Sequence, residues 1–234
     1  MADSENNMKA AISLALCVAV LAAGCGGGGG GAGGAVAIAP IPKPQSISYQ
    51  DPTGTGWRLV RDASSTSTRI VLNLVGPAGV STRGVGFNLQ RGTNLQFGAF
   101  TGGGYAHDTG VFELKGSNAN FEPYAGTDAD PVLFVSAPLP SGKVLSTGIF
   151  QKDRSFTAKD AAQPLVQVAV ELAPGSPGIP ADAAKQAAAY GLAVIKARMI
   201  PADIGAPDFI LTVEAIAKAK MQDISIDVGT ITAQ

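Results

Sequence analysis

The most acidic part of the chain carries side chains that could bind a metal ion. Between Asp108 and Asp130 there are five carboxylates against the single Lys115, so the stretch has a net charge of −4. Calcium takes hard oxygen ligands from loops of this kind, and Glu122, Asp128 and Asp130 are the candidate ligands of a Ca²⁺ site. The alternative interpretation is a set of solvated turn carboxylates, because the later ligands of a calcium loop are missing.

The single histidine limits the catalytic chemistry open to this chain. His107 lies beside Asp108 in the glycine-rich segment 101–110, and one imidazole excludes a metal site with several histidine ligands. A serine hydrolase built on a nucleophile elbow needs a GxSxG motif, which does not occur in the sequence. We therefore expect His107 to be a solvated loop residue and the protein not to be an enzyme.

Three aromatic residues are candidates for ligand binding. Tyr105 and Tyr124 lie in glycine-rich segments, and Trp57 is the single tryptophan. Flat aromatic rings beside polar loops suit the stacking of sugar rings. The alternative is that these rings belong to the core, because aromatic residues make up only 6% of the chain.

The segment 57–91 is basic, with five arginines and one carboxylate, that of Asp62. One interpretation is charge pairing across strands on a solvated face, where each pair contributes about 0.2–1 kcal/mol. The other is a surface that contacts the acidic stretch of a second copy of the chain or a polyanionic ligand. The arginines are Arg58, Arg61, Arg69, Arg83 and Arg91.

An apolar segment near the amino terminus predicts export. Lys9 is followed by uncharged residues from Ala10 to Ala23, which end in small side chains. A helix of that length spans roughly 21 Å, which is short of the roughly 30 Å hydrocarbon core of a membrane. The segment is therefore interpreted as the apolar region of a signal peptide, and Met8 followed by Lys9 makes a better start than Met1.

The segment Leu21-Ala22-Ala23-Gly24-Cys25 resembles the lipobox of bacterial lipoproteins. The resemblance implies cleavage before Cys25, a diacylglycerol on its thiol and attachment of the protein to a membrane. An ordinary secretory signal is the alternative. Because the other cysteine, Cys17, would leave with the signal peptide, we expect no disulfide.

The expected domain organisation follows from this terminus. Residues 1–24 are interpreted as the signal peptide, and residues 25–46, rich in glycine and then in proline, as the lipid anchor and a flexible linker. Residues 47–234 are predicted to form one domain. Its composition, with 30 Gly, 15 Pro and 15% charged residues in the whole chain, favours strands and turns over helices.

Alternation with a period of two residues identifies the strands. In segment 69–75 it places Ile70, Leu72 and Leu74 on one face, and 165–172 repeats the pattern, so both are predicted to be half-buried. The eleven predicted strands are 57–62, 69–75, 85–90, 95–100, 111–115, 132–137, 144–151, 165–172, 192–199, 210–217 and 224–232.

One helix is expected, over residues 181–190. It follows Pro180 and precedes Gly191, and Asp182 lies where a negative charge stabilises a helix amino terminus. The predicted fold class is therefore all-β: a single β-sandwich of jelly-roll or cohesin-like type, with about nine to eleven strands and this one short helix.

The segment from Val85 to Phe97 resembles the cohesin-like and carbohydrate-module-like sandwiches of bacteria. In those, a Gly-x-x-Phe-x-Leu strand leads through a turn into a Leu-x-Phe strand, as Gly84 to Leu89 and Leu95 to Phe97 do here. The resemblance implies an extracellular domain that binds.

The expected function is that of an exported, lipid-anchored lipoprotein that acts as a binding or scaffold module at the bacterial cell envelope, for a glycan or an envelope protein. The alternative is a structural subunit that self-assembles at the cell surface. A net charge of −1 argues against nucleic acid as a partner. The outer membrane or cell surface is the favoured location, and no cofactor other than Ca²⁺ is expected.

Overall fold

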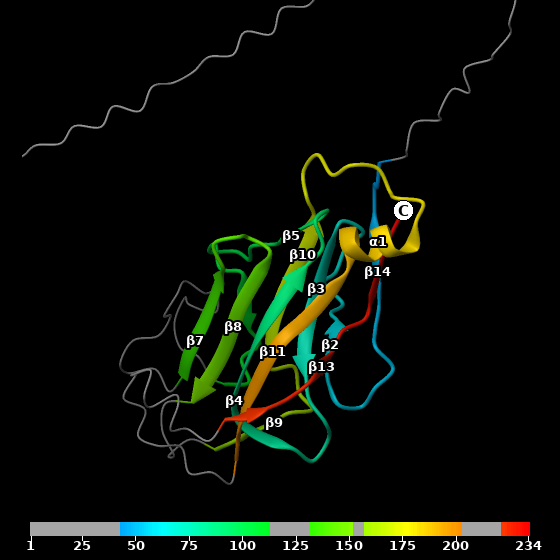
Figure 1. Cartoon of the computed structure of the whole chain (residues 1–234). Helices are drawn as coiled ribbons and strands as arrows, with labels where there is room; N and C mark the ends of the chain where they lie inside the picture. The colour runs from blue at the N-terminus through cyan, green and yellow to red at the C-terminus, as the bar shows by residue number, and fades with distance from the viewer. Residues whose placement is uncertain (1–42, 113–131, 152–156, 203–220) are drawn as a thin grey trace, which may run out of the picture. The chain divides into compact units, whose positions relative to one another are not determined.

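The computed structural model of the protein describes residues 43–112, 132–151, 157–202 and 221–234. These residues all belong to the unit Pro40–Gln234. They form two six-stranded sheets that share one core, a two-stranded sheet and one helix (Figure 1). The expected all-β sandwich is confirmed, and the predicted strand 210–217 lies outside the described residues.

The first six-stranded sheet has the order β13-β2-β3-β10-β5, and β6 also pairs with β10. Its neighbours are antiparallel except β13 and β2, which are parallel. β5 and β6 pair with successive parts of β10, so the chain leaves this sheet edge after β5 and returns to it at β6. The strands are β2 (Trp57–Arg61), β3 (Arg69–Val75), β5 (Leu95–Phe97), β6 (Ala106–Asp108), β10 (Val166–Leu172) and β13 (Ile226–Asp227).

The second six-stranded sheet has the order β12-β11-β4-β8-β7, and β9 pairs with β4. The separate two-stranded sheet pairs β1 (Ile47–Gln50) with β14 (Thr230–Ala233). The strands of the second sheet are β4 (Ser81–Arg91), β7 (Val132–Pro138), β8 (Val144–Gln151), β9 (Lys159–Asp160), β11 (Leu192–Pro201) and β12 (Gln222–Asp223).

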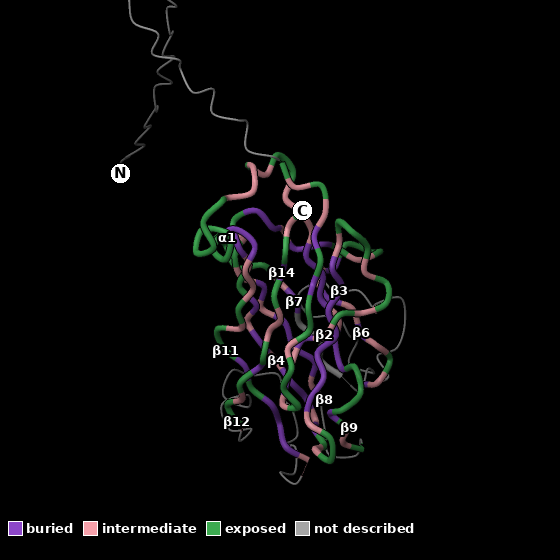
Figure 2. Tube along the Cα trace, turned by 90° about the vertical axis from the view of Figure 1, so that its right-hand side faces the viewer, coloured by how far each residue is buried: buried purple, intermediate pink, exposed green. Residues whose placement is uncertain are grey.

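The core is built from the alternating aliphatic residues of the two sheets. Ile70, Leu72 and Leu74 of β3 are fully buried, as the sequence predicts, and the buried residues run along the central strands (Figure 2). The prediction that β3 is only half-buried is wrong, because Val71 and Asn73 on its other face are also buried. Polar and aromatic groups of neighbouring loops cover that second face, as described below.

The segment that resembles cohesin-like sandwiches crosses from one sheet to the other. Phe87 and Leu89 of β4 and Leu95 and Phe97 of β5 are all buried in the core cluster. Because β4 belongs to the second sheet and β5 to the first, this short connection holds the two layers together.

The helix α1 spans Ala183–Tyr190, two residues shorter at its start than predicted. Asp182 is its N-cap residue, and its carboxylate accepts a hydrogen bond from the Lys185 N–H at 2.9 Å. An N-cap side chain satisfies an amide that has no partner within the helix. The helix therefore begins after Asp182.

Two long strands extend beyond their predictions, since β4 begins at Ser81 and β11 ends at Pro201, and the other differences concern short elements. Val111 and Phe112 form a turn, and the strand of this region is β6, earlier in the chain. The predicted strand 224–232 is divided into β13 and β14, and the predicted strand 95–100 ends at Phe97. Strands of two to four residues such as β1, β9 and β12 show too few alternations for a pattern to identify them.

None of the helices within the described residues has the length and apolar character needed to cross a membrane.

Replacing Tyr49 with phenylalanine is expected to lower the free energy of unfolding by about 1–3 kcal/mol. The Tyr49 hydroxyl donates to Leu59 O at 2.9 Å and accepts from the Gly229 N–H at 2.6 Å, so the change leaves both groups without a partner. Urea unfolding of both proteins measures the loss.

The same hydroxyl predicts an alkaline transition. Burial raises the pKa of Tyr49 from 10.0 to about 12, opposed by the Gly229 N–H and assisted by Asp51. Because the folded pKa is raised, this contribution to stability is present below pH 10 and lost as the pH rises through about 12. The free energy of unfolding of Tyr49→Phe should therefore fall less between pH 10 and pH 12 than that of the unchanged protein. An identical pH dependence for both proteins would contradict a raised pKa of Tyr49.

Candidate functional site

A hollow of about 340 Å³ lies beside the first sheet, where β3, β10 and β6 meet the loops that follow β2 and β6. Six of the eight residues that line it have polar side chains. The lining residues are Asp62, Asn73, His107, Asp108, Thr109, Val111, Pro164 and Gln167.

Three of the polar residues form a row across adjacent strands. Gln167 of β10 is the register partner of Asn73 on β3 and of His107 on β6. Because side chains alternate along a strand and Val166 and Val168 face the core, Gln167 and its two partners lie on the opposite face. The strand pairing therefore brings together residues that are far apart in sequence.

Asp62 lies at the end of β2 and is held by four hydrogen bonds. Its Oδ1 accepts from the Ser64 N–H at 2.9 Å and from the Ser64 hydroxyl at 2.6 Å, as in an Asx turn. Its Oδ2 accepts from Asn73 Nδ2 at 2.7 Å and from Gln167 Nε2 at 3.2 Å. The Ser64 hydroxyl, then the Ser64 N–H and the two amides, lower the pKa of Asp62 against the effect of burial. Because its pKa is lowered, Asp62 is ionised at neutral pH and gives the hollow a negative charge.

Asp108 differs from Asp62 in its surroundings. It is 4% exposed, and its Oδ1 has no hydrogen-bond partner. Burial raises the pKa of Asp108, opposed by the Gly110 N–H, the charge of His107 and the Thr109 N–H. One hollow thus contains two carboxyl groups whose pKa values are shifted in opposite directions, which is a feature of functional sites.

Three buried polar atoms around the hollow have no partner: Asn73 Oδ1, His107 Nδ1 and Asp108 Oδ1. In the described residues the other two such atoms are the hydroxyls of Ser136 and Thr147, which face each other across β7 and β8. A buried polar group without a partner costs about 1–3 kcal/mol, and native proteins contain few of them. Three at one hollow indicate a place for a ligand that supplies the missing partners.

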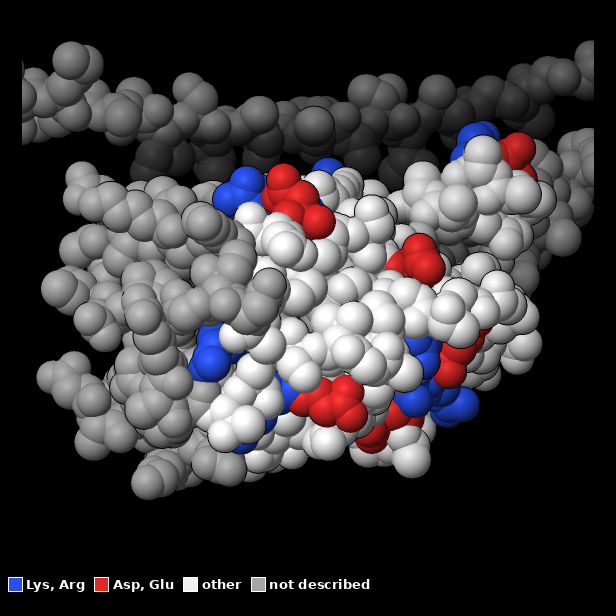
Figure 3. Space-filling view, turned by 90° about the horizontal axis from the view of Figure 1, so that it is seen from below, with Lys and Arg blue, Asp and Glu red and all other residues white. Residues whose placement is uncertain are grey.

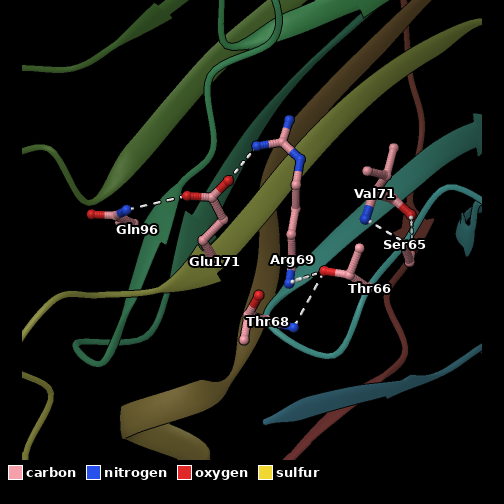
Figure 4. A network of polar contacts seen from close by, with 7 residues as sticks. All are labelled: Ser65, Thr66, Thr68, Arg69, Val71, Gln96 and Glu171. Carbon is pink, nitrogen blue, oxygen red and sulfur yellow. Dashed lines mark hydrogen bonds and ion pairs between the residues drawn. The ribbon is translucent and has the colours of Figure 1, made fainter. Parts of the chain in front are cut away.

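An aromatic and ionic network lies beside the hollow on the same sheet. The Phe100 ring is 5.5 Å from the His107 ring, and the Arg69 guanidinium is 5.0 Å from the Phe100 centroid. Arg69 also forms an ion pair with Glu171, which accepts from Gln96 Nε2 at 3.2 Å (Figure 4). Contacts on two sides hold Phe100 in place, and with it one side of the His107 ring.

The loop that carries Phe100 is a compact turn. Gly98 donates its N–H to Ala169 O of β10 at 2.9 Å, directly after the end of β5. Phe100 then donates to Gly104 O at 2.7 Å, and Gly103 to Phe100 O at 2.9 Å. Gly103 has a φ of 93°, which favours glycine at this position. The glycine-rich sequence is thus used to fold Phe100 back over the sheet.

Four of the five arginines of segment 57–91 form hydrogen bonds within the fold. Arg58, Arg69, Arg83 and Arg91 each donate to an oxygen atom of this chain. Figure 3 shows Lys and Arg next to Asp and Glu on the face seen from below, with no large patch of one sign. The interpretation of the segment as a docking surface for an acidic partner stays a prediction.

The structure corrects two expectations about site residues. His107 is not a solvated loop residue, because it lies on β6 with a buried ring nitrogen. Trp57 is 7% exposed and belongs to the core, so its ring cannot stack on a sugar. Tyr105 is half-buried and packs against the core. The remaining predicted site residues, Cys25, Glu122, Tyr124, Asp128 and Asp130, lie outside the described residues.

The sequence interpretation did not identify Asp62, Asn73 and Gln167 as site residues. The available signals were Asn73 and Gln167, polar residues inside the aliphatic runs of β3 and β10. Within the described part of the chain, no group of three or more His, Cys, Asp or Glu residues is placed to hold a metal ion.

Comparison of the chain with known proteins finds a similar solved structure but no matching family. No family model matches the sequence, and no curated protein matches it. Among solved structures, the chain is similar to a type II cohesin domain from the cellulosome of Acetivibrio cellulolyticus. The match has 11% sequence identity and a TM-score of 0.41, and it covers 76% of this chain and 93% of that chain.

Replacing Asp108 with asparagine is expected to raise the melting temperature at pH 7 by a few degrees. A raised folded pKa means that the contribution of this carboxyl to stability is present below pH 3.8 and lost as the pH rises through the folded value. At neutral pH the buried charge therefore lowers stability, and the uncharged amide removes that penalty. Thermal unfolding at pH 7 and at pH 3 tests this; an equal change at both pH values would contradict it.

Proposed function

We propose that this protein is a binding module of the bacterial cell envelope whose ligand, a glycan or an envelope protein, contacts the hollow lined by Asp62, Asn73, His107, Asp108 and Gln167. The observation that carries the proposal is the group of three buried polar atoms without partners around that hollow. A protein that keeps such groups loses stability, and selection retains them where they serve function.

The rigid surroundings of the hollow support binding. Asn73, Gln167 and His107 lie on three neighbouring strands, and Phe100 and Asp62 are each held by several contacts. A site built on strands loses little conformational entropy when the ligand arrives. The same arrangement gives the ligand several hydrogen-bonding groups at fixed positions, which favours selectivity.

Amide chemical-shift mapping tests the binding function. The ¹H–¹⁵N spectrum of the protein is recorded while a panel of monosaccharides, amino sugars and short peptides is added one at a time. If the ligand binds in the hollow, we expect the amide signals of His107, Thr109 and Gln167 to shift. The signals of Arg198 and Asp223 should not change. Shifts that cluster elsewhere, or none for any member, would reject the proposal.

The proposed location at the envelope rests on the lipobox that ends at Cys25. The acyl chains would attach the protein to a membrane at about 0.8 kcal/mol for each buried CH₂ group, and the segment 25–46 would act as the linker to the folded domain. Intact mass of membrane-extracted protein should show a species that begins at Cys25 and carries acyl mass, absent from Cys25→Ser. An unmodified species cut at another position would indicate free secretion.

A further inference from the structure

The amide groups of the hollow have a fixed orientation. An ionised carboxylate can only accept hydrogen bonds, so Asn73 and Gln167 must both turn their NH₂ groups toward Asp62 Oδ2, at 2.7 and 3.2 Å. Exchange of oxygen and nitrogen in either amide would bring an oxygen against the carboxylate. The carbonyl oxygens are therefore the ends that remain for another partner, and Asn73 Oδ1 is buried without one.

Apart from His107, whose ring always carries at least one N–H donor, the other polar groups of the hollow also accept. The Thr109 hydroxyl donates to Pro164 O at 2.5 Å, so its proton is already used. Asp108 Oδ1 is unpartnered and accepts when the group is ionised. Pro164 has no N–H, and no Lys or Arg lines the hollow. The lining therefore offers mainly acceptors around the negative charge of Asp62.

The hollow is large enough for an organic ligand. A water molecule occupies roughly 30 Å³ in the liquid, and the hollow has about 340 Å³. Among the described residues no cluster of His, Cys, Asp and Glu is arranged to hold a metal ion. An acceptor-rich site of this size therefore fits a molecule of several heavy atoms that brings its own hydrogen-bond donors.

We propose that the hollow binds a primary ammonium group of its ligand, with Asp62 as the counter-ion and Asn73 Oδ1 as an acceptor; this inference rests on the proposed binding function. An ammonium has three donors and no acceptor, which matches the lining in both charge and hydrogen bonding. A neutral hydroxyl group also has acceptor lone pairs, and the hollow has few donors for them. An anionic ligand would be repelled by the negative charge of Asp62. An amino sugar and a lysine side chain share this chemistry.

Matched ligand pairs test the inference by calorimetric titration of the full chain. The first pair is glucosamine and N-acetylglucosamine, and the second is a lysine blocked at both ends and the same compound acetylated on its side chain. At least one ammonium compound should bind about tenfold more tightly than its acetylated partner, since hydrogen bonds to charged groups contribute about 1.5–3 kcal/mol. The pair that shows the difference identifies the source of the ammonium.

Two variants separate the role of Asp62 from a general loss of charge. Asp62→Asn should remove the preference for the ammonium, while Asp223→Asn, which removes an exposed carboxylate paired with Arg198, should keep it. Urea unfolding checks that both variants fold. If Asp62→Asn does not fold, Gln167→Leu, which keeps the carboxylate and removes one acceptor, is expected to weaken ammonium binding several-fold.

Three results would overturn the inference: equal affinity within both pairs, an unchanged preference in Asp62→Asn, or no binding of either ammonium compound. Binding of neutral sugars at His107 and Gln167 without an ammonium preference would reject the ammonium and leave the proposed binding function in place. Absence of any ligand in the shift map would reject both.

Discussion

Replacing Gly92 with alanine is expected to destabilise the protein by about 3 kcal/mol. A Cβ at this position would lie 2.3 Å from Ala189 O and 2.7 Å from Tyr190 N, and backbone atoms cannot rotate away as a side chain can. The Gly92 N–H donates to Gly191 O at 2.7 Å, and that of Asn94 donates to Ala189 O at 2.9 Å. The alanine would both overpack this contact and disturb the bonds that end α1, and overpacking typically costs 1–3 kcal/mol, occasionally more.

Gly56→Ala is the matched control. A Cβ on Gly56 would have no atom within 4 Å, and Gly56 has no positive φ. Its substitution is expected to change the free energy of unfolding by less than about 0.5 kcal/mol. Urea unfolding of the three proteins measures both values, and a loss below about 1 kcal/mol in Gly92→Ala would show that the connection between β4 and β5 does not depend on its contact with α1.

Arg91→Met is the second large expected effect, a loss of about 2–4 kcal/mol. The Arg91 guanidinium donates to Gly142 O at 3.0 Å, to Gly92 O at 3.0 Å and to Leu95 O, and it lies 5.8 Å from the Phe97 centroid. It therefore joins the hairpin of β7 and β8 to the start of β5, between the two sheets. Methionine keeps most of the apolar stem but leaves three carbonyl groups without this donor, and hydrogen bonds to charged groups contribute about 1.5–3 kcal/mol each.

Arg198→Met provides the comparison. Arg198 pairs with Asp223 at 2.7 Å, and the side chains are 46% and 78% exposed. Exposed pairs of this kind contribute about 0–1 kcal/mol because water and salt screen them. Thermal and urea unfolding should therefore show a much larger loss of stability for Arg91→Met than for Arg198→Met. A similar small loss in both would mean that water replaces the donors of Arg91 without penalty.

The sequence identifies the long strands because alternation has room to repeat, although β4 begins four residues before its predicted start. The bounds of β3 and β8 agree with the prediction, and both strands have seven or more residues. The helix is found because Pro180 and Gly191 mark its ends and Asp182 caps it. A short strand such as β6 is set by its pairing, here with β10, and that pairing is a tertiary contact.

The site could be predicted only in part, for a similar reason. Gln167 and Asn73 interrupt aliphatic strands, and a polar residue in that position ordinarily faces water. Here the loop of Phe100 and the turn of Asp62 lie on that face, and only the fold shows that they do. His107 was identified as notable because it is the single histidine, but its buried nitrogen depends on the pairing of β6 with β10.

The most direct test of the central claim is a paired measurement on Asn73→Leu. The claim is that the polar atoms of the hollow serve a ligand, and Leu has the branched four-atom side chain of Asn without its polar atoms. The account predicts that the tightest ligand of the sugar and peptide panel binds about tenfold more weakly to this variant, while the urea midpoint shows that the domain remains folded. An unchanged affinity in a folded variant would contradict the account and leave the hollow without a role in binding.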